Sequence, residues 1–454
     1  GDILAMACKP NYDLNTPFVP IESDLLKDWD SIDSADKTSI LNEMWRNRNV
    51  SSTYEPGSTF KLITSAVALE ENTTSEDVSG DFTCIGYEKV NGIDIKCWRK
   101  IPHGSQTLRQ ALENSCNPAF MQLGKRIGSQ TLYKYYDAFG LFDKTGVAIP
   151  GEAVGIFHKL ENVNNVELAT MSFGQRITVT PLQLVTAISS IANEGKLMQP
   201  RIVKQIINPD TNSTTTIEPQ EVRQVISKST ANRMLDLMNS VVSEGTGHRA
   251  QVAGYSVGGK TGTSEPISGN EDEGYVASFV AVSPTENPEI CLLVALFDPH
   301  GESHQGGTVC GPVISSMLGE ILPYLGLTST DISTATVNST QDNSNVIVPD
   351  VRNKTLTEAK KILTKSGLKI NYSVTGDENS LLVKSQNPPA GSLLQSGSTI
   401  LLYTEENDVR ISVSVPDLTG LTVQEASTAL TSKNLNIFFE NTGSYIESQE
   451  IKKD

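Results

Sequence analysis

The alternation of apolar and polar residues predicts a chain that mixes helices with an antiparallel sheet. Within the first ~325 residues, the stretches 254–263, 275–283 and 290–297 are apolar or alternating and are bounded by turns, as strands are. Short connections rich in Gly, Asn and Pro favour antiparallel hairpins, because parallel pairing requires crossover helices. A closing helix is expected at 313–325. The fold class indicated is therefore α+β.

The earlier part of the chain is expected to be one strand followed by helices. Residues 1–7 have a strand-like composition, and Pro56-Gly57 before an apolar run marks a helix that begins at or near Ser58. A short helix is expected at 107–113. Together these segments predict helices packed on the sheet and a helical insertion between its early and late strands.

Composition changes near residue 327 and a repeat follows. Residues 327–345 are mostly Ser, Thr, Asn and Asp, as in a linker. After them, Val348-Pro-Asp recurs at Val415, and Glu358-Ala recurs at Glu425, both at an offset of 67 residues. Two copies of one small αβ module are therefore expected, at 346–406 and 412–454. The turn that begins at Asn387 would recur only at the last residue, so the second copy is incomplete.

Charge and hydropathy exclude two classes of protein. The chain has 454 residues and a net charge of −17, which argues against a nucleic-acid binder because such a protein needs a basic face. No apolar run reaches the ~18 residues of a membrane span, and the given sequence contains no signal peptide. We therefore expect a portion of a longer protein whose targeting segment lies outside this sequence.

Six cysteines are too few for a disulfide scaffold in a chain of this length. Cys84 and Cys97 enclose a short loop and could pair or stay as thiols. Cys116 is interpreted as a small packing residue, with a redox role as the alternative. His103 is interpreted as a hydrogen-bonding residue of a loop rather than as a base.

The first candidate for chemistry is the pair Ser58 and Lys61. They are three residues apart, so they share one face of the predicted helix. A serine hydroxyl is a poor nucleophile until a base takes its proton, and a desolvated lysine can be that base. The helix N-terminus adds free N–H groups where an oxyanion would form. Alone, this motif is also explained by a helix cap and a surface lysine.

Two further triplets change that interpretation. Ser115-Cys-Asn117 follows the short helix at 107–113, and Lys260-Thr-Gly262 lies on a predicted strand. On a strand, Lys260 and Gly262 share a face, and the bare glycine would let a peptide lie along the strand. Ser-x-x-Lys, Ser-x-Asn and Lys-Thr-Gly in this order are the signature of penicillin-binding proteins and serine β-lactamases.

Spacing and surroundings select within that group. Ser58 to Ser115 is 57 residues and Ser115 to Lys260 is 145, longer than a compact β-lactamase needs. With the segments 173–175, 179–184 and 244–250, residues 1–326 resemble the transpeptidase domain of class B, high-molecular-weight penicillin-binding proteins. The repeated module resembles the PASTA domain, and the combination resembles the division and sporulation members of the family. This resemblance implies an antiparallel five-stranded sheet flanked by helices, with an all-helical subdomain.

The resemblance also implies a D,D-transpeptidase that cross-links peptidoglycan stem peptides ending in D-Ala-D-Ala. Ser58 would be the nucleophile, Lys61 its base, Ser115 a proton relay and Asn117 a ligand of the substrate amide. Among the strand residues, Lys260 would supply positive charge and the remaining positions would bind substrate: Thr261, Gly262 and Thr263. No cofactor is required, and β-lactams would acylate the same serine.

The alternatives are a D,D-carboxypeptidase or β-lactamase, in which water resolves the acyl-enzyme, and a non-enzymatic sensor of muropeptides. The PASTA modules could bind wall fragments or merely brace the large domain. By resemblance, the full-length protein would be anchored in the membrane and extracytoplasmic. Its expected partners are a glycosyltransferase that uses lipid-linked precursors and the division or spore-envelope machinery. The sequence does not choose between division and sporulation.

One loop departs from the family pattern. Between the last strand and the closing helix, four residues with metal-binding side chains fall within thirteen positions: Asp298, His300, His304 and Cys310. Carboxylate, imidazole and thiolate are ligands of tetrahedral Zn²⁺, and the glycines nearby would let the loop fold round an ion. The loop therefore predicts either a structural zinc site beside the Lys260 strand or a polar loop with two solvated histidines.

Overall fold

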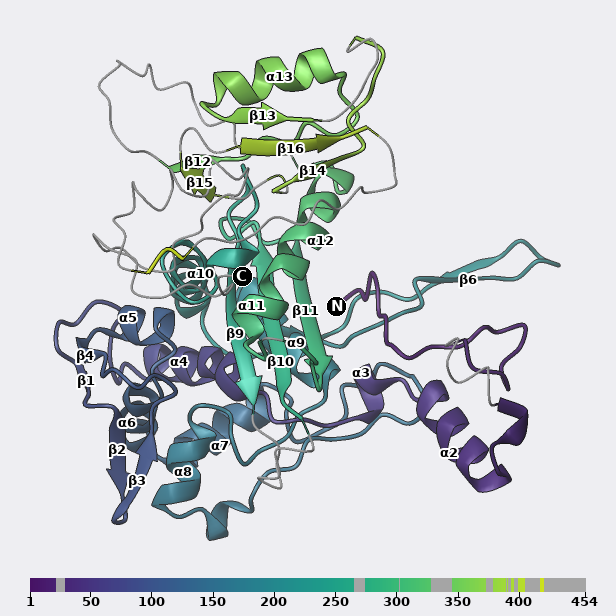
Figure 1. Cartoon of the computed structure of the whole chain (residues 1–454). Coiled ribbons are helices and arrows are strands. Elements are labelled where there is room, and N and C mark those ends of the chain that lie inside the picture. Colours follow the sequence, from purple (N-terminus) through teal and green to yellow (C-terminus); the bar gives the residue numbers. More distant parts are fainter. Residues whose placement is uncertain are drawn as a thin grey trace. The chain divides into compact units, whose positions relative to one another are not determined.

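The computed structural model describes residues 1–21, 29–264, 274–301, 303–327, 345–372, 379–388, 390, 393–395, 399–404 and 417–419. The chain divides into two compact units (Figure 1). The larger contains residues 1–251 and 255–327, and the smaller contains 252–254 and 328–454. Each unit is described by itself.

The large unit is built on an antiparallel sheet of strands β9, β10 and β11 in the order β11-β10-β9 (Figure 1). β10 (Val276–Ser283) is central and pairs along its whole length with β11 (Ile290–Phe297), while its other edge pairs with β9 (Gly258–Ser264). The hairpins match the predicted antiparallel pairing.

The described residues place three strands in this sheet, so the expected count of five is not confirmed. Residues 1–7, predicted to be a strand, contribute only a single parallel bridge between Asp2 and Arg201. The other strands of the unit form separate two-stranded pairs, β1-β4, β2-β3, β5-β8 and β6-β7. Their bounds are Phe82–Cys84 (β1), Tyr87–Val90 (β2), Ile93–Lys96 (β3), Gly104–Gln106 (β4), Lys196–Met198 (β5), Gln205–Ile207 (β6), Thr214–Thr216 (β7) and Glu221–Gln224 (β8).

Helices surround the sheet, which confirms the α+β class. α9 packs on β11, α10 on β9, and α11 and α12 contact β10. The helices of the large unit are α2 (Ser34–Trp45), α3 (Arg48–Ser51), α4 (Lys61–Glu70), α5 (Leu108–Glu113), α6 (Asn117–Ile127), α7 (Ser129–Ala138), α8 (Asn165–Met171), α9 (Pro181–Ala192), α10 (Lys228–Ser243), α11 (Gly306–Val309) and α12 (Gly311–Tyr324). Single 3₁₀ turns are η1 (Trp29–Ser31), η2 (Gly57–Phe60), η3 (Leu160–Asn162) and η4 (His248–Ala250).

The predicted all-helical subdomain is not purely helical, because β1 to β4 lie within it. β2 and β3 are joined by Asn91 and Gly92, with φ of 49° and 84°. Asn-Gly is the preferred two-residue hairpin turn because both positions need positive φ. This turn was a sequence signal for a hairpin that the helical interpretation overlooked.

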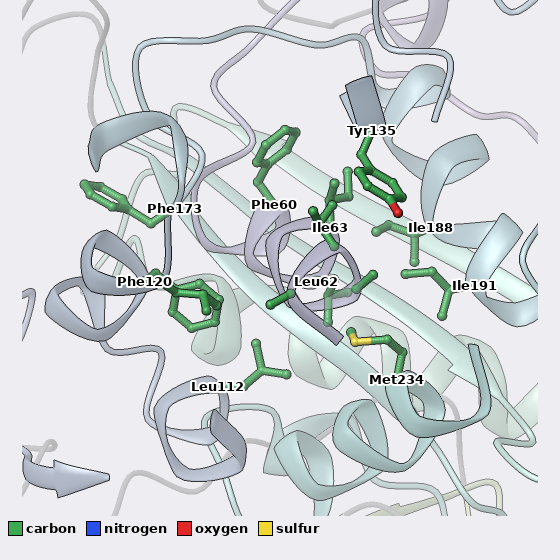
Figure 2. Packing of buried hydrophobic residues seen from close by; sticks show 14 of the residues in the cluster. Phe60, Leu62, Ile63, Leu112, Phe120, Tyr135, Phe173, Ile188, Ile191 and Met234 are labelled. Atoms are coloured by element: carbon green, nitrogen blue, oxygen red, sulfur yellow. The ribbon is translucent and has the colours of Figure 1, made fainter. Parts of the chain in front are cut away.

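Helix α4 is the centre of the hydrophobic core. Nine of its ten residues are buried, so the helix is enclosed on every side, as expected of a helix inside a domain. Figure 2 shows Leu62 and Ile63 of this helix among side chains of several other elements, including Phe120, Ile188 and Met234. The first residues of α4 are therefore held on all sides.

The small unit has its own core around α13 (Leu356–Lys365), formed by residues such as Val351, Leu363 and Ile400. Thr355 and Glu358 form a reciprocal capping box that fixes where the helix begins. The strands are β12 (Asn345–Ile347), β13 (Lys369–Asn371), β14 (Ser385–Asn387), β15 (Leu393–Gln395) and β16 (Thr399–Tyr403); β12 pairs with β15, and the others form a sheet in the order β13-β16-β14.

The predicted second copy, 412–454, lies outside the described residues except for 417–419. The same holds for most of the linker predicted at 327–345. Across the parts of the chain that the structure covers, no helix combines the length and the apolarity needed to cross a membrane.

Candidate active site

Ser58 lies on the 3₁₀ turn η2, directly before α4, and its side chain is half-buried. The predicted α-helix therefore begins at Lys61, one turn later than expected. In a 3₁₀ turn, side chains at positions i and i+3 eclipse each other. This places Lys61 Nζ 3.1 Å from Ser58 Oγ.

Lys61 Nζ joins the serine to the Ser-x-Asn segment. It donates hydrogen bonds of 2.7 Å to the backbone carbonyl oxygen of Ser115 and of 2.7 Å to Asn117 Oδ1. Ser115 Oγ lies 3.2 Å from the same nitrogen. Two of the motifs that the sequence singled out, 54 to 56 residues apart, therefore converge on one amine.

The surroundings of Lys61 favour its neutral form. The residue is fully buried, and the rings of Phe120 and Phe173 lie 5.4 Å and 5.9 Å from Nζ. Burial lowers the pKa of Lys61 to about 7, against smaller opposite effects of Cys116 and Cys97. No carboxylate accepts a hydrogen bond from this lysine in the described structure. At neutral pH, the neutral and protonated forms of this amine are therefore present in comparable amounts, as a general base requires.

The Ser-x-Asn segment is a tight connection between two helices. Ser115 follows α5 and has a left-handed φ of 52°, which is uncommon for a residue other than glycine. Cys116 caps α6, which begins at Asn117 with Pro118 in its first turn. The turn directs the carbonyl oxygen and the hydroxyl of Ser115 to the same lysine.

The third motif lies on β9, which is an edge strand in the described sheet. Lys260 is fully buried, and its Nζ donates to Thr261 Oγ1 at 3.1 Å and to the Thr261 carbonyl oxygen at 3.2 Å. Burial, followed by the charge of Lys61, lowers the pKa of Lys260 well below its usual value. The side chains of Lys61 and Lys260 are therefore close enough to influence each other's protonation.

Gly262 is required by packing rather than by an open groove on its own face. A Cβ atom built at Gly262 would lie 2.4 Å from Ser278 Oγ and 3.0 Å from the carbonyl oxygen of Pro56. In the same way, a Cβ atom on Gly57 would lie 2.8 Å from the carbonyl oxygen of Thr263. These two glycines let the turn that carries Ser58 sit directly against β9.

Thr263 is connected to the start of α11. Its Oγ1 accepts a 3.1 Å hydrogen bond from the backbone N–H of Gly306 and lies 3.5 Å from Gln305 Oε1. Gln305 was not singled out in the sequence, since nothing in its local pattern relates it to a residue 42 positions away. Its side chain now lies beside the position expected to bind a substrate carboxylate.

The four residues of the predicted zinc loop do not form one group in the described structure. His300 Nε2 lies 3.2 Å from Asp298 Oδ2, but the His300 side chain is 89% exposed. His304 stacks on Tyr275 at 3.9 Å between ring centroids. Cys310 is buried at the start of α12, and burial raises the pKa of its thiol to about 12. Helix capping and ring stacking thus separate residues that are close in sequence.

A different group of metal-ligating side chains does meet. Atoms of Cys84, Cys97, His103 and Cys116 all lie within 4.8 Å of one another, and the cysteines are free thiols. The sequence relates Cys84 only to Cys97, and it gives His103 and Cys116 separate interpretations. The signal that could have found them is density, since three of six cysteines and one of five histidines fall between positions 84 and 116.

Two family models match the chain. The penicillin-binding protein transpeptidase domain matches residues 1–319, and the PASTA domain matches residues 346–406.

Curated proteins with similar sequences carry related names. The chain is 37% identical over 411 residues to stage V sporulation protein D of Bacillus subtilis, covering 90% of this chain and 60% of that protein. It is 29% identical over 338 residues to a probable peptidoglycan D,D-transpeptidase, PenA, of Neisseria gonorrhoeae, covering 74% and 52%. The chain therefore spans between half and two thirds of the length of these relatives.

Solved structures agree with the sequence matches. The D,D-transpeptidase domain of a peptidoglycan glycosyltransferase from Eggerthella lenta has a TM-score of 0.60 and 27% identity, covering 71% of this chain and 75% of that one. The transpeptidase domain of penicillin-binding protein 3 from Burkholderia pseudomallei has a TM-score of 0.55 and 31% identity, covering 63% and 83%.

Proposed function

Because the chain belongs to the penicillin-binding protein transpeptidase family and also carries a PASTA domain, we propose that it is a serine D,D-transpeptidase that cross-links peptidoglycan. The observation that carries the proposal is the position of Lys61 Nζ, which lies within 3.2 Å of the side-chain oxygens of Ser58, Ser115 and Asn117. The proposed nucleophile, Ser58, and the proposed proton relay, Ser115, thus both lie within hydrogen-bonding distance of the proposed base, Lys61.

The hydrogen bonds of Lys61 support its role as general base. A neutral amine has two N–H groups and one lone pair. The two shortest contacts, both 2.7 Å, are to acceptors, the carbonyl oxygens of Ser115 and of the Asn117 side chain. With both N–H groups used there, the lone pair is left for a hydroxyl, and Ser58 Oγ is 3.1 Å away.

In the proposed reaction, Ser58 Oγ attacks the carbonyl carbon between the two terminal D-alanines of a stem peptide. Lys61 takes the hydroxyl proton, and the C–N bond breaks. The Ser115 hydroxyl relays a proton to the leaving amine, so free D-alanine departs and an ester with Ser58 remains. The amine of a neighbouring stem then attacks that ester, forming the cross-link and returning the proton to Ser58.

Strand β9 is proposed to hold the donor peptide as an added strand, because its outer edge is unpaired in the described sheet. Thr263, beside Gln305, would bind the terminal carboxylate, with Lys260 contributing an N–H donor and Thr261 a hydroxyl. The backbone N–H groups of Ser58 and Thr263 would form the oxyanion hole. The close approach of Gly57 to Thr263 supports this pairing.

Labelled penicillin tests the serine chemistry. We expect a stable adduct on the wild-type chain, localised to Ser58 by peptide mapping, and none on Ser58→Ala. Ser65→Ala is the matched control, because Ser65 is a buried serine on α4 whose hydroxyl has no hydrogen-bond partner. Rapid release of the label would favour a β-lactamase, and a Ser58→Ala variant that still labels would refute the assignment.

A second assay separates a transpeptidase from a carboxypeptidase. A donor peptide ending in D-Ala-D-Ala is incubated with an acceptor amine, and the products are resolved by mass spectrometry. Transpeptidation predicts a peptide joined to the acceptor, whereas a carboxypeptidase gives only the shortened, hydrolysed peptide. Absence of both products together with absence of labelling would favour the muropeptide-sensor alternative.

The wider organisation is proposed from the same resemblance. The transpeptidase domain would span 1–326, the linker 327–345, the first PASTA module 346–406 and an incomplete second module 412–454. The full-length protein would be anchored in the membrane with these domains outside the cytoplasm. It would act with a glycosyltransferase that uses lipid-linked precursors and with division or spore-envelope proteins. The similarity to a sporulation protein supports that setting.

A further inference from the structure

Apart from the serine site, three cysteines and one histidine converge in the part of the large unit that contains β1 to β4. One ligand atom from each of Cys84, Cys97, His103 and Cys116 lies within 4.8 Å of all the others. We propose that these four side chains form a tetrahedral Zn²⁺ site with three thiolates and one imidazole. The inference does not depend on the proposed transpeptidase activity.

The spacing of the ligand atoms suits one zinc ion. Tetrahedral bonds of about 2.3 Å to sulfur and about 2.0–2.1 Å to nitrogen imply S···N separations of about 3.6 Å and S···S separations of about 3.8 Å. Cys97 Sγ lies 3.6 Å from His103 Nδ1. The upper limit of 4.8 Å for the remaining pairs is about 1 Å from ideal. Small side-chain rotations would therefore complete the site.

The backbone holds the four ligands in place without a metal. Cys84 ends β1 and pairs with Gly104 of β4, so His103 precedes the residue that faces Cys84 across this strand pair. The Cys97 N–H donates to the carbonyl oxygen of Gly86 at 2.8 Å. The Cys116 N–H donates to the carbonyl oxygen of Ala111 at 2.9 Å. Folding therefore orders the ligand residues before a metal ion binds, and binding loses little further conformational entropy.

The polar atoms of the cluster are poorly accounted for by packing alone. The side chains of Cys84, Cys97 and Cys116 are buried, so their sulfur atoms are shielded from water. His103 Nδ1 has the sulfur of Cys97 as its polar neighbour. Three buried thiols and an imidazole within reach of one point are the ligand set of a structural Zn²⁺ site.

The site would position the Ser-x-Asn segment. Cys116 is the residue between Ser115 and Asn117, both of which accept hydrogen bonds from Lys61. A metal bound to Cys116 would tie this segment to β1 and to the Cys97 loop. Cys116 is therefore assigned as a positioning residue, and the ion as structural, with no part in the chemical steps.

X-ray absorption on the zinc-loaded wild-type chain identifies the ligand set without any mutation. The proposed site predicts three sulfur ligands and one nitrogen ligand. The loop set Asp298, His300, His304 and Cys310 would instead give one sulfur ligand and three nitrogen or oxygen ligands. A first shell with a single sulfur would overturn the proposal.

The second test is the zinc content of matched variants. Each variant is the whole 454-residue chain, purified with a reductant and zinc. We expect one equivalent in the wild type, its loss in Cys84→Ser, and its retention in the control His304→Ala. Chelation should lower the melting temperature of the wild type and of His304→Ala by the same amount. Less than a tenth of an equivalent in the wild type, or zinc lost from His304→Ala and kept in Cys84→Ser, would refute the site.

Should Cys84→Ser fail to fold, the absorption measurement on the wild type still decides the question. Thiol counting adds an independent readout, because bound zinc protects three thiols that become reactive after chelation. Three cysteines that stay equally reactive with and without zinc, in folded protein, would contradict the proposal. None of these measurements uses penicillin or peptide turnover, so their failure is distinct from failure of the proposed function.

Discussion

The carbonyl oxygen of Ser115 accepts a 2.7 Å hydrogen bond from Lys61 Nζ, across 54 residues of sequence. The residue that presents this oxygen has a left-handed φ of 52°. Backbone conformations of this kind cost about 1–3 kcal/mol and persist where the surrounding structure over-determines them. The turn is fixed here by α5 on one side and α6 on the other. The geometry of Lys61 therefore depends on a strained backbone position as well as on side chains.

Two substitutions at Ser115 should separate the effect of its backbone conformation on stability from the effect of its hydroxyl on acylation. Ser115→Ala and Ser115→Gly both remove the proposed proton relay, so both should slow acylation of Ser58 by at least ~100-fold. Glycine accepts positive φ without strain, so Ser115→Gly should be about 1 kcal/mol more stable than Ser115→Ala. Urea denaturation and stopped-flow acylation by a chromogenic β-lactam measure the two effects. Equal stability of the variants would show that the conformation carries no strain.

Acylation of Ser58 should rise with pH and level off above about 7. Only neutral Lys61 can accept the serine proton, and burial brings its pKa to about 7. Below that value the rate should fall about tenfold per pH unit. The second-order rate constant for acylation, measured from pH 5 to pH 9 with a slowly hydrolysed penicillin, tests this. A rate independent of pH across that range would contradict the role of Lys61 as the base.

The same pKa has a consequence for stability with a definite sign. Between pH 7 and about 10.4, Lys61 is neutral when folded and protonated when unfolded, so the unfolded state binds more protons. The free energy of unfolding should therefore rise with pH, by up to about 1.4 kcal/mol per pH unit from this group. Lys260 contributes with the same sign. The test is the difference in slope between wild type and Lys61→Met, which should lack the contribution of Lys61.

Local patterns predicted the hairpin strands well, and they located the three short motifs whose catalytic role is proposed above. The strand expected at 290–297 matches β11, because its apolar run and the flanking turns are contained within the segment itself. The motifs Ser-x-x-Lys, Ser-x-Asn and Lys-Thr-Gly could be found because each places its residues within three or four consecutive positions. Their convergence was inferred only from resemblance to a family.

What the sequence could not supply are relations between distant segments. The closeness of Gly262 to Pro56 depends on how β9 packs on η2, and no local pattern encodes it. The cluster of Cys84 with Cys116 depends on the β1-β4 pair lying next to the start of α6. Conversely, Asp298 and Cys310 are close in sequence but differ in exposure, because α12 buries Cys310. Closeness in sequence therefore does not by itself bring ligand-type residues together in space.

Gly262→Ala should disturb the site through packing. The added methyl group would lie 2.4 Å from Ser278 Oγ and 2.9 Å from Thr59 Cγ2, so β9 or the turn carrying Ser58 must shift. We expect a loss of about 1–3 kcal/mol in the free energy of unfolding and slower acylation. The matched control is Gly319→Ala in α12, where a Cβ atom has nothing within 4 Å. It should stabilise the protein by up to about 1 kcal/mol and leave acylation unchanged.

The two compact units should respond separately to loss of core volume. Leu363 is fully buried in the core around α13, and Leu184 is fully buried in the core of the large unit, on α9. Truncation of a buried leucine to alanine costs about 2–5 kcal/mol through lost burial and the cavity left behind. If each unit unfolds on its own, Leu363→Ala should lower only the calorimetric transition of the small unit. Penicillin acylation of Ser58 should then stay at the wild-type rate.

Leu184→Ala is the matched variant for the other unit, with the same change of side chain. It should lower the transition of the large unit and leave that of the small unit unchanged. A single transition that shifts equally in both variants would mean that the two cores unfold cooperatively. That outcome would contradict the proposed division of the chain at the linker, because contacts between the units would then have to contribute a large part of the stability.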